Sequence, residues 1–184
     1  MAQRPTIPTK RLILRPFVLT DAADVQRMAR DKEIASTTVK IPHPYEDGMA
    51  EEWISTHQEA FESDEGLNLA ITSRDTGLLV GSVGLRMQRE HQRAELGFWV
   101  GKPFWGRGYC TEAAAAMVRH GFEAMGLNRI YAYYLSRNPA SGRVLEKIGM
   151  THEGRSRQHE IKWGQFEDLE CSAIIASEYR GIRD

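Results

Sequence analysis

Residues 102–122 read KPFWGRGYCTEAAAAMVRHGF, and this stretch decides how the rest of the chain is interpreted. An aromatic, apolar run leads into two glycines, and an alanine-rich segment then predicts a strong helix over about 109–125. Backbone N–H groups at the start of a helix have no partner within the helix, and the helix dipole makes them attractive to an anion. Since Gly106 and Gly108 carry no side chains, a phosphate or diphosphate can approach these amides.

Hydrophobic periodicity places this stretch inside a mixed domain. Before it, the sequence predicts a strand over residues 10–17, a helix with Thr20 as its N-cap, a second helix over about 49–63, and strands over 67–73, 78–88 and 94–100. After the alanine helix, it predicts a strand over 128–135, a short helix over 139–149, and strands over 151–163 and 166–176 joined by a WGQ turn. The RDTG link at 74–77 is typical of a hairpin. The expected fold class is α/β (α+β), with a largely antiparallel sheet and one central strand–helix–strand crossover.

Composition argues against several classes of protein. The 184 residues include 24 Lys and Arg against 25 Asp and Glu, so the net charge of −1 lacks the basic footprint of a nucleic-acid-binding protein. No apolar run approaches the roughly 18 residues of a membrane span, and the N-terminus lacks the apolar region of a signal peptide. Cys110 and Cys171 form no CxxC pair, which argues against structural zinc and for a reducing compartment. We expect a cytoplasmic protein without a membrane, nucleic-acid or metal partner.

Two familiar phosphate-binding motifs do not fit the loop. A P-loop ends in Gly-Lys-Ser/Thr, whereas Gly108 is followed by Tyr109 and Cys110. A dinucleotide-binding fingerprint needs a third glycine where Thr111 stands, and its strand usually opens the domain. The remaining candidate is the coenzyme A loop of an acetyltransferase.

Two segments carry a resemblance to a known family. ELGFWVGKPFWGRGYCTEA (95–113), followed by NPASGRVLEKIGM (138–150), resembles the GNAT superfamily of acyl-CoA N-acyltransferases, in the branch of the RimJ and RimL protein N-terminal acetyltransferases. The resemblance extends over nearly the whole chain, and the two motifs in this order are specific. It implies one GNAT acetyltransferase domain over residues 1–184, with a V-shaped split in a mostly antiparallel central sheet flanked by helices. We also expect acetyl-CoA as co-substrate, no metal, an amine acceptor, and a monomer or homodimer.

The resemblance further assigns a coenzyme site. The family's loop pattern, Gln/Arg-x-x-Gly-x-Gly/Ala, falls on Trp105, Gly108 and Cys110; Gly108 obeys it, and tryptophan in the first slot resembles the RimJ/RimL branch. The resemblance implies three groups of coenzyme contacts. The strand backbone of Phe98, Trp99 and Val100 would contact the pantetheine arm, and two residues of the second motif, Asn138 and Arg143, would also contact the coenzyme. The diphosphate would be bound by the loop amides of Arg107, Gly108, Tyr109, Cys110 and Thr111. A solvated helix face explains Arg143 at least as well.

Acetyl transfer to an amine needs a base for the ammonium proton and an acid for the departing thiolate. Glu95 resembles a carboxylate that some GNAT members carry before the loop and is the candidate base; the alternative is a cross-strand ion pair with an arginine such as Arg93. Many members carry the acid as a tyrosine where this chain has Leu145. Ser141, three residues after Asn138, resembles the acid of RimL-like proteins; its alternative role is a hydrogen bond to backbone at a helix start.

Cys110 raises a second chemical hypothesis. A thiol at a helix N-terminus is expected to have a lowered pKa, and it could in principle accept an acetyl group itself, which would give a ping-pong enzyme. Direct transfer is the habit of the superfamily, and this slot needs a small residue in any case. Glu112, close to Cys110, is expected to be a favourable charge at the helix start.

The acceptor side is expected in the N-terminal half. Residues 41–73 contain no lysine or arginine but eight acidic residues, which suit a cationic amine or a basic protein tail; a solvated helix face explains them as well. Tyr45 and His43 are candidate cleft walls, whereas Trp53 and His57 are expected in the core, the latter as a satisfied histidine. The preferred acceptor is the α-amino terminus of a protein or peptide. The alternatives are a polyamine, a small amine metabolite or antibiotic, or a non-catalytic acyl-CoA-binding module.

Overall fold

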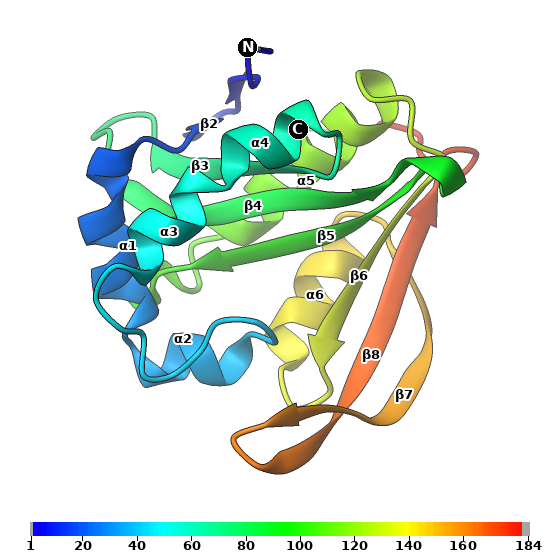
Figure 1. Cartoon of the computed structure of the whole chain (residues 1–184). Helices are drawn as coiled ribbons and strands as arrows, with labels where there is room; N and C mark the ends of the chain where they lie inside the picture. Colours follow the sequence, from blue (N-terminus) through cyan, green and yellow to red (C-terminus); the bar gives the residue numbers. More distant parts are fainter. Residues whose placement is uncertain (1, 182–184) are drawn as a thin grey trace.

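The computed structural model describes residues 2–181, which form an eight-stranded sheet with helices on both faces (Figure 1). The strands are β1 (Ile7–Pro8), β2 (Leu12–Pro16), β3 (Gly66–Ser73), β4 (Leu79–Gln88), β5 (Arg93–Val100), β6 (Arg129–Leu135), β7 (Thr151–Lys162) and β8 (Gln165–Ile175), in the spatial order β1-β2-β3-β4-β5-β6-β8-β7. The α-helices are α1 (Ala22–Ala29), α2 (Lys32–Thr37), α3 (Met49–Ser55), α4 (His57–Glu62), α5 (Tyr109–Glu123) and α6 (Pro139–Lys147). β5 and β6 are parallel and the other neighbouring strands antiparallel, which confirms the predicted fold class and the crossover through α5.

The sheet splits where its parallel strands meet. In the described part of the chain, β5 and β6 share three residue pairs, which join Arg93–Glu95 to Arg129–Tyr131. Beyond them, β5 stays paired with β4 up to Val100, while β6 stays paired with β8 up to Leu135. Figure 1 shows the two strands meeting at the upper right and separating toward the lower left, with α6 near the open end. This divergence is the V-shaped split that the family resemblance implied.

Two apolar clusters hold the helices against opposite faces of the sheet. Leu12 and Leu14, two residues apart on one face of β2, are fully buried in the cluster that includes α5 and α6. Phe17 is buried in the second cluster, with side chains of α1 and α3. Because helices cover both faces of the sheet, the place where its strands separate is the widening gap between β5 and β6.

Two helix boundaries were predicted wrongly. Thr20 is not an N-cap, because Leu19–Asp21 form a 3-10 turn and Asp21 immediately precedes α1, its carboxylate held by Arg15 at 2.7 and 2.8 Å. The helix expected over 49–63 is interrupted at Thr56, whose hydroxyl donates to the carbonyl of Trp53 at 2.8 Å and competes with the helical ladder. β1 and α2 were not predicted, since two and six residues are too few to show periodicity.

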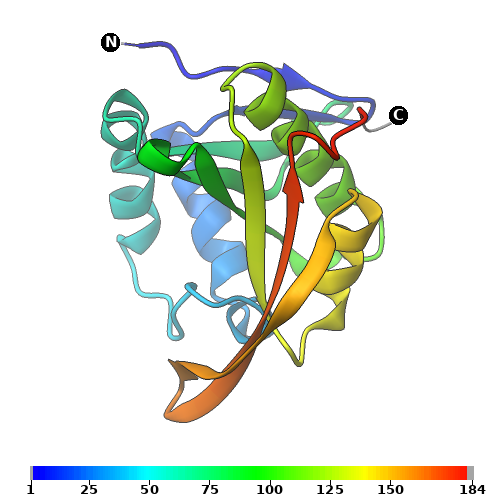
Figure 2. The same cartoon turned by 90° about the vertical axis from the view of Figure 1, so that its right-hand side faces the viewer.

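The β7–β8 hairpin extends beyond the body of the sheet (Figure 2). Its turn places Trp163 and Gly164 at φ values of +52° and +77°, which confirms the predicted WGQ turn. Lys162 at the tip donates from Nζ to the carbonyls of Val39 and Ile41 at 3.4 and 3.2 Å. The hairpin therefore holds the loop that follows α2.

The close approach of β4 to β5 makes one glycine essential for stability. A Cβ at Gly81 would lie 2.1 Å from the carbonyl oxygen of Trp99 and 2.7 Å from the Cα of Val100, both of them backbone atoms. Gly97 is the matched control, because a Cβ there has no neighbour within 4 Å. We expect Gly81→Ala to lower the free energy of unfolding by about 3 kcal/mol in urea titrations, well beyond the effect of Gly97→Ala. Equal stabilities of the two variants would contradict the register of β4 and β5.

Candidate active site

Two cavities lie along the split between β5 and β6. The larger, of about 780 Å³, runs between the sheet, the loop after α2, and helices α3 and α4. The smaller, of about 330 Å³, lies between the end of β5, the start of α5 and the start of α6. Five residues line both cavities, and they mark a junction at which the two meet: Thr37, Thr38, Phe98, Trp99 and Ser141.

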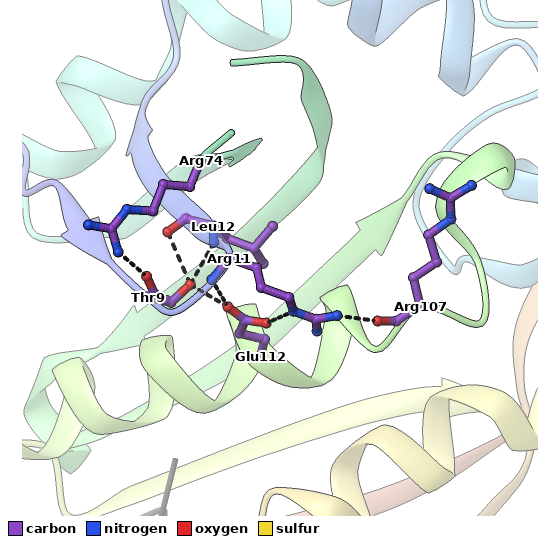
Figure 3. A network of polar contacts seen from close by, with 6 residues as sticks. All are labelled: Thr9, Arg11, Leu12, Arg74, Arg107 and Glu112. Atoms are coloured by element: carbon purple, nitrogen blue, oxygen red, sulfur yellow. Dashed lines mark hydrogen bonds and ion pairs between the residues drawn. The ribbon is translucent and has the colours of Figure 1, made fainter. Parts of the chain in front are cut away.

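The smaller cavity brings together most of the predicted coenzyme contacts. Its lining includes nine of the ten, which are Phe98, Trp99, Val100, Gly108, Tyr109, Cys110, Thr111, Asn138 and Arg143. Arg107 is exposed and outside this lining, and in Figure 3 its side chain points away from the neighbouring polar network. Lys147, which sequence reasoning missed, lines the cavity one helical turn beyond Arg143.

The loop before α5 presents free amides to this cavity. Gly108 precedes the helix in a left-handed conformation, with φ +77°. The first helical hydrogen bond runs from the amide of Glu112 to the carbonyl of Gly108 at 3.1 Å. Within the described residues, the amides of Tyr109, Cys110 and Thr111 have no protein acceptor. Trp105 fixes the other side of the loop, because its indole N–H donates to the carbonyl of Val100 at 2.9 Å.

Glu112 in the first turn of α5 belongs to a network that reaches β2 (Figure 3). Its carboxylate accepts hydrogen bonds from the Thr9 hydroxyl at 2.7 Å, the Arg11 amide at 2.7 Å and the Arg11 Nε at 2.6 Å. Burial raises the pKa of Glu112, but these hydrogen bonds outweigh it, so the pKa lies below its usual value. The predicted charge at the helix start is therefore present, and it is paired with a cation.

Ser141 and Asn138 form one hydrogen-bonded unit at the start of α6. The Asn138 side chain caps the helix by accepting from the Ser141 amide at 3.4 Å. Its Nδ2 group donates to the Ser141 hydroxyl and to the carbonyl of Thr37, each at 2.9 Å. Both protons of the Asn138 amide are thus used inside the protein. The arrangement joins α2 to α6 and orients the Ser141 hydroxyl at the junction of the cavities.

Glu95 lines the larger cavity from β5. Its carboxylate forms ion pairs with Arg86, directly opposite on β4, and with Lys40, whose Nζ lies at 3.6 Å. The cross-strand partner is therefore Arg86; Arg93, named in the alternative hypothesis, donates instead to Gln88 at 2.6 Å. Neither Lys40 nor Arg86 was predicted, because a register and a loop path bring them to Glu95.

The predicted lowering of the Cys110 pKa is wrong. Burial raises the pKa of this thiol to about 12, so it is protonated at neutral pH despite its place in the first turn of α5. The desolvation of a thiolate here outweighs the helix dipole, whose effect is typically at most about 2 kcal/mol. Cys110 consequently acts as a small cavity-lining residue, and the ping-pong hypothesis loses its physical basis.

Aromatic side chains form much of the wall of the larger cavity. Tyr45 and Trp53 line it, and Trp53 also packs against the second apolar cluster, so both the core and the cleft interpretations hold for this residue. His43 does not line it and instead lies 5.9 Å from Trp163, ring centroid to ring centroid. His57 is buried, as predicted, but it is not satisfied: neither ring nitrogen has a hydrogen-bond partner among residues 2–181, and burial lowers its pKa to about 4.

No cluster of His, Cys, Asp or Glu in residues 2–181 is placed to hold a metal ion. Over the same range, none of the helices combines the length and the apolar character of a membrane span.

The sequence and its relatives identify the family. The model of the acetyltransferase (GNAT) domain matches residues 11–151, so the chain belongs to the GNAT family of acetyltransferases. It is 30% identical over 172 residues to YoaA of Bacillus subtilis, an uncharacterised N-acetyltransferase, covering 93% of this chain and 97% of the relative. It is 29% identical over 84 residues to the ribosomal protein uS5-alanine N-acetyltransferase of Escherichia coli, covering 46% and 43%. The RimJ/RimL resemblance is thereby confirmed, and the protein is an acetyltransferase.

Solved structures agree with this assignment. A GNAT acetyltransferase from Bacillus anthracis superposes with a TM-score of 0.85 at 25% identity, over 95% of this chain and 100% of that one. RimJ of Mycobacterium smegmatis, solved with a CoA disulfide, gives 0.84 at 25% identity, over 96% and 90%. Spermidine N-acetyltransferase of Vibrio cholerae, solved with CoA and spermine, gives 0.80 at 20% identity, over 93% and 99%, which is a likeness of fold alone.

The residues of the smaller cavity suit the anionic part of coenzyme A, the acyl carrier that GNAT acetyltransferases use. Three free amides at the start of α5 suit a diphosphate, and Gly108 keeps side-chain atoms away from them. Arg143 and Lys147 add two cations to the same lining. The coenzyme would supply an activated thioester, and these residues would bind and orient its anionic part.

The left-handed conformation of Gly108 gives a test of the loop. An alanine at this φ is strained by roughly 1–2 kcal/mol, and its Cβ would lie 3.4 Å from Arg11 Nη2. The loop is expected to relax in the free protein, and binding must then restore the strained form. Gly108→Ala should therefore raise the CoA dissociation constant about tenfold in calorimetric titrations. Gly126→Ala is the control, since Gly126 has φ +65°, no neighbour within 4 Å of its Cβ and no place in the cavity lining. Equal affinities in both variants would contradict the role of this glycine.

The protonated state of Cys110 gives a second test. Because burial holds its pKa at about 12, iodoacetamide should alkylate Cys110 very slowly at pH 8, and Cys110→Ala should retain acetyl transfer at close to the wild-type rate. Cys171→Ala is the matched control, because it removes the other cysteine of the chain and leaves Cys110 in place. An acetylated Cys110, found by mass spectrometry after incubation with acetyl-CoA alone, would restore the ping-pong hypothesis.

Proposed function

We propose that this acetyltransferase is one GNAT domain that transfers the acetyl group of acetyl-CoA to a primary amine, preferably the α-amino terminus of a protein or peptide. The meeting of the two cavities carries the proposal. The smaller receives the coenzyme, the larger receives the acceptor, and Phe98, Trp99 and Ser141 line both. A thioester and an amine that enter from opposite sides therefore come together at this junction, which supplies the proximity that acyl transfer needs.

The charge of the larger cavity supports an acceptor with a single cation. Its lining contains three carboxylates, Glu52, Glu65 and Glu95, against two cations, Lys40 and Arg86. Both cations pair with Glu95. The net balance of −1 matches one ammonium group, whereas a polyamine carries several. Together with the aromatic wall, this favours an amine attached to a largely neutral body, as at a peptide N-terminus.

Glu95 and Ser141 are proposed as the acid–base pair of the reaction. Glu95 takes the proton from the acceptor's ammonium group, directly or through a water molecule, and the neutral amine then attacks the thioester carbonyl. Ser141 donates a proton to the departing thiolate. Its hydroxyl oxygen accepts from Asn138 Nδ2, which leaves its own proton available and makes it a better donor. Asn138 acts on this account as a positioning residue rather than a direct coenzyme contact.

The setting of the enzyme is also part of the proposal. The composition and the reduced cysteines favour the cytoplasm, where acetyl-CoA and amine acceptors are both expected. Its partners are acetyl-CoA and the acceptor, with no nucleic acid and no metal in the reaction. The protein is proposed to act as a monomer or homodimer.

A panel of acceptors tests the proposed function. CoA binding by the wild-type protein is first established by calorimetric titration. Thiol release is then assayed with short peptides bearing free N-termini and with spermidine. Mass spectrometry identifies the position of the acetyl group in the products. We expect transfer to the α-amino group of peptides. Transfer to spermidine alone would show that the acceptor is a polyamine and not a peptide N-terminus. CoA binding without turnover on any amine would indicate a non-catalytic module.

Glu95→Gln tests the proposed base. We expect CoA affinity to be preserved, kcat to fall by roughly 100-fold, and the acidic limb of the kcat–pH profile to flatten, because the variant cannot accept the ammonium proton. Glu65→Gln removes another carboxylate from the same cavity and should leave the shape of the profile unchanged. An unaltered profile in Glu95→Gln would assign the base to another group.

A further inference from the structure

We propose that Arg11 is a positioning residue for the coenzyme loop, which it holds in the conformation that receives the diphosphate. The proposal rests on the proposed function of the smaller cavity as the coenzyme site. Arg11 lies 96 residues before Arg107 in sequence, next to the start of β2, and outside both cavity linings. Its effect on the coenzyme is therefore exerted through the loop.

The guanidinium group of Arg11 makes three contacts with the loop and helix α5, and Figure 3 shows the two hydrogen bonds among them. Its Nη1 donates to the backbone carbonyl of Arg107 at 2.9 Å, and its Nε donates to Glu112 at 2.6 Å. Its central carbon also lies 4.9 Å from the ring centroid of Tyr109. One planar side chain thus bridges the residue before Gly108 and the first turn of α5, as the fixed fork of an arginine allows.

The bond to the Arg107 carbonyl controls the direction of the next amide. In a planar trans peptide, the C=O of one residue and the N–H of the next point in opposite directions. Because Arg11 holds the Arg107 carbonyl toward its own side chain, the N–H of Gly108 is directed away from Arg11. Without this bond, a rotated peptide would present a carbonyl oxygen to the anion.

Arg11 also compensates an unfavourable charge. A carboxylate in the first turn of α5 suits the helix dipole but repels a diphosphate bound at the same helix start. Glu112 is ionised at neutral pH, because the pKa of its carboxyl is held below the usual value. The pairing with Arg11 neutralises it, and the side chains are 46% and 17% exposed, so the pair is partly shielded from solvent.

Arg11 is itself anchored to the sheet. Its carbonyl accepts from the amide of Arg74 at 2.9 Å, and the neighbouring Thr9 carbonyl accepts from Arg74 Nη1 at 3.2 Å. The Thr9 hydroxyl donates to the same Glu112 carboxylate as Arg11. The loop is therefore fixed to the β2–β3 edge of the sheet as well as to its own helix.

The experiment compares Arg11→Gln with Arg74→Gln, which removes the side-chain bond to the Thr9 carbonyl but keeps the backbone amide bond that anchors Arg11. CoA affinity is measured by calorimetric titration, and kcat/KM is measured with acetyl-CoA and with S-acetylpantetheine, which lacks the diphosphate. We expect Arg11→Gln to weaken CoA binding about tenfold, since a charge-assisted hydrogen bond to the loop is lost. We expect kcat/KM to fall for acetyl-CoA but not for S-acetylpantetheine, and Arg74→Gln to leave both ligands unaffected.

Arg11→Lys is the second variant, because it keeps a cation beside Glu112 but cannot span the carboxylate and the Arg107 carbonyl together. Its CoA affinity should lie between those of the wild type and Arg11→Gln, and its turnover of S-acetylpantetheine should be unchanged. Equal losses with acetyl-CoA and S-acetylpantetheine would reduce Arg11 to a general structural role and overturn the proposal. Unchanged CoA affinity in Arg11→Gln would also overturn it, while leaving the proposed function intact. Failure of the wild-type protein to bind CoA would instead overturn the proposed function.

Discussion

β5 and β6 share three residue pairs in the described chain and then diverge, and the arrangement of the site depends on this separation. Each strand keeps an antiparallel partner, β4 or β8, along its further length, so only the strand edges that face the split lose their pairing when the two separate. The edge of β5 that faces the opening supplies Phe98 and Trp99 to both cavities. The split therefore provides the strand edge and the space around it at the same time.

Contacts between distant segments hold the open end of the split. Asn138 joins the end of α2 to the start of α6 and orients Ser141. Lys162 of the β7–β8 hairpin holds the loop after α2, which contributes Val39 and Ile41 to the larger cavity. Arg11 joins β2 to the start of α5 (Figure 3). These hydrogen bonds fix both rims, so the two cavities keep their relative position.

The parts of the molecule that sequence reasoning predicted are those encoded by contiguous residues. The long strands and α5 have clear periodicity, and the predicted coenzyme contacts lie in two short motifs, so nine of the ten line one cavity. What could not be predicted depends on tertiary structure. The pairing of Glu95 with Arg86 follows from strand register, the link from Arg11 to the loop crosses 96 residues, and the raised pKa of Cys110 comes from burial rather than from its place on the helix.

A crystal structure of the protein with CoA would test the central claim most directly, namely that the two cavities meet at a single reaction site. We expect the diphosphate on the amides of Tyr109, Cys110 and Thr111, the pantetheine arm along the free edge of β5, and the thiol sulfur within hydrogen-bond distance of the Ser141 hydroxyl. Coenzyme bound elsewhere, or a thiol directed away from the junction of the cavities, would contradict it.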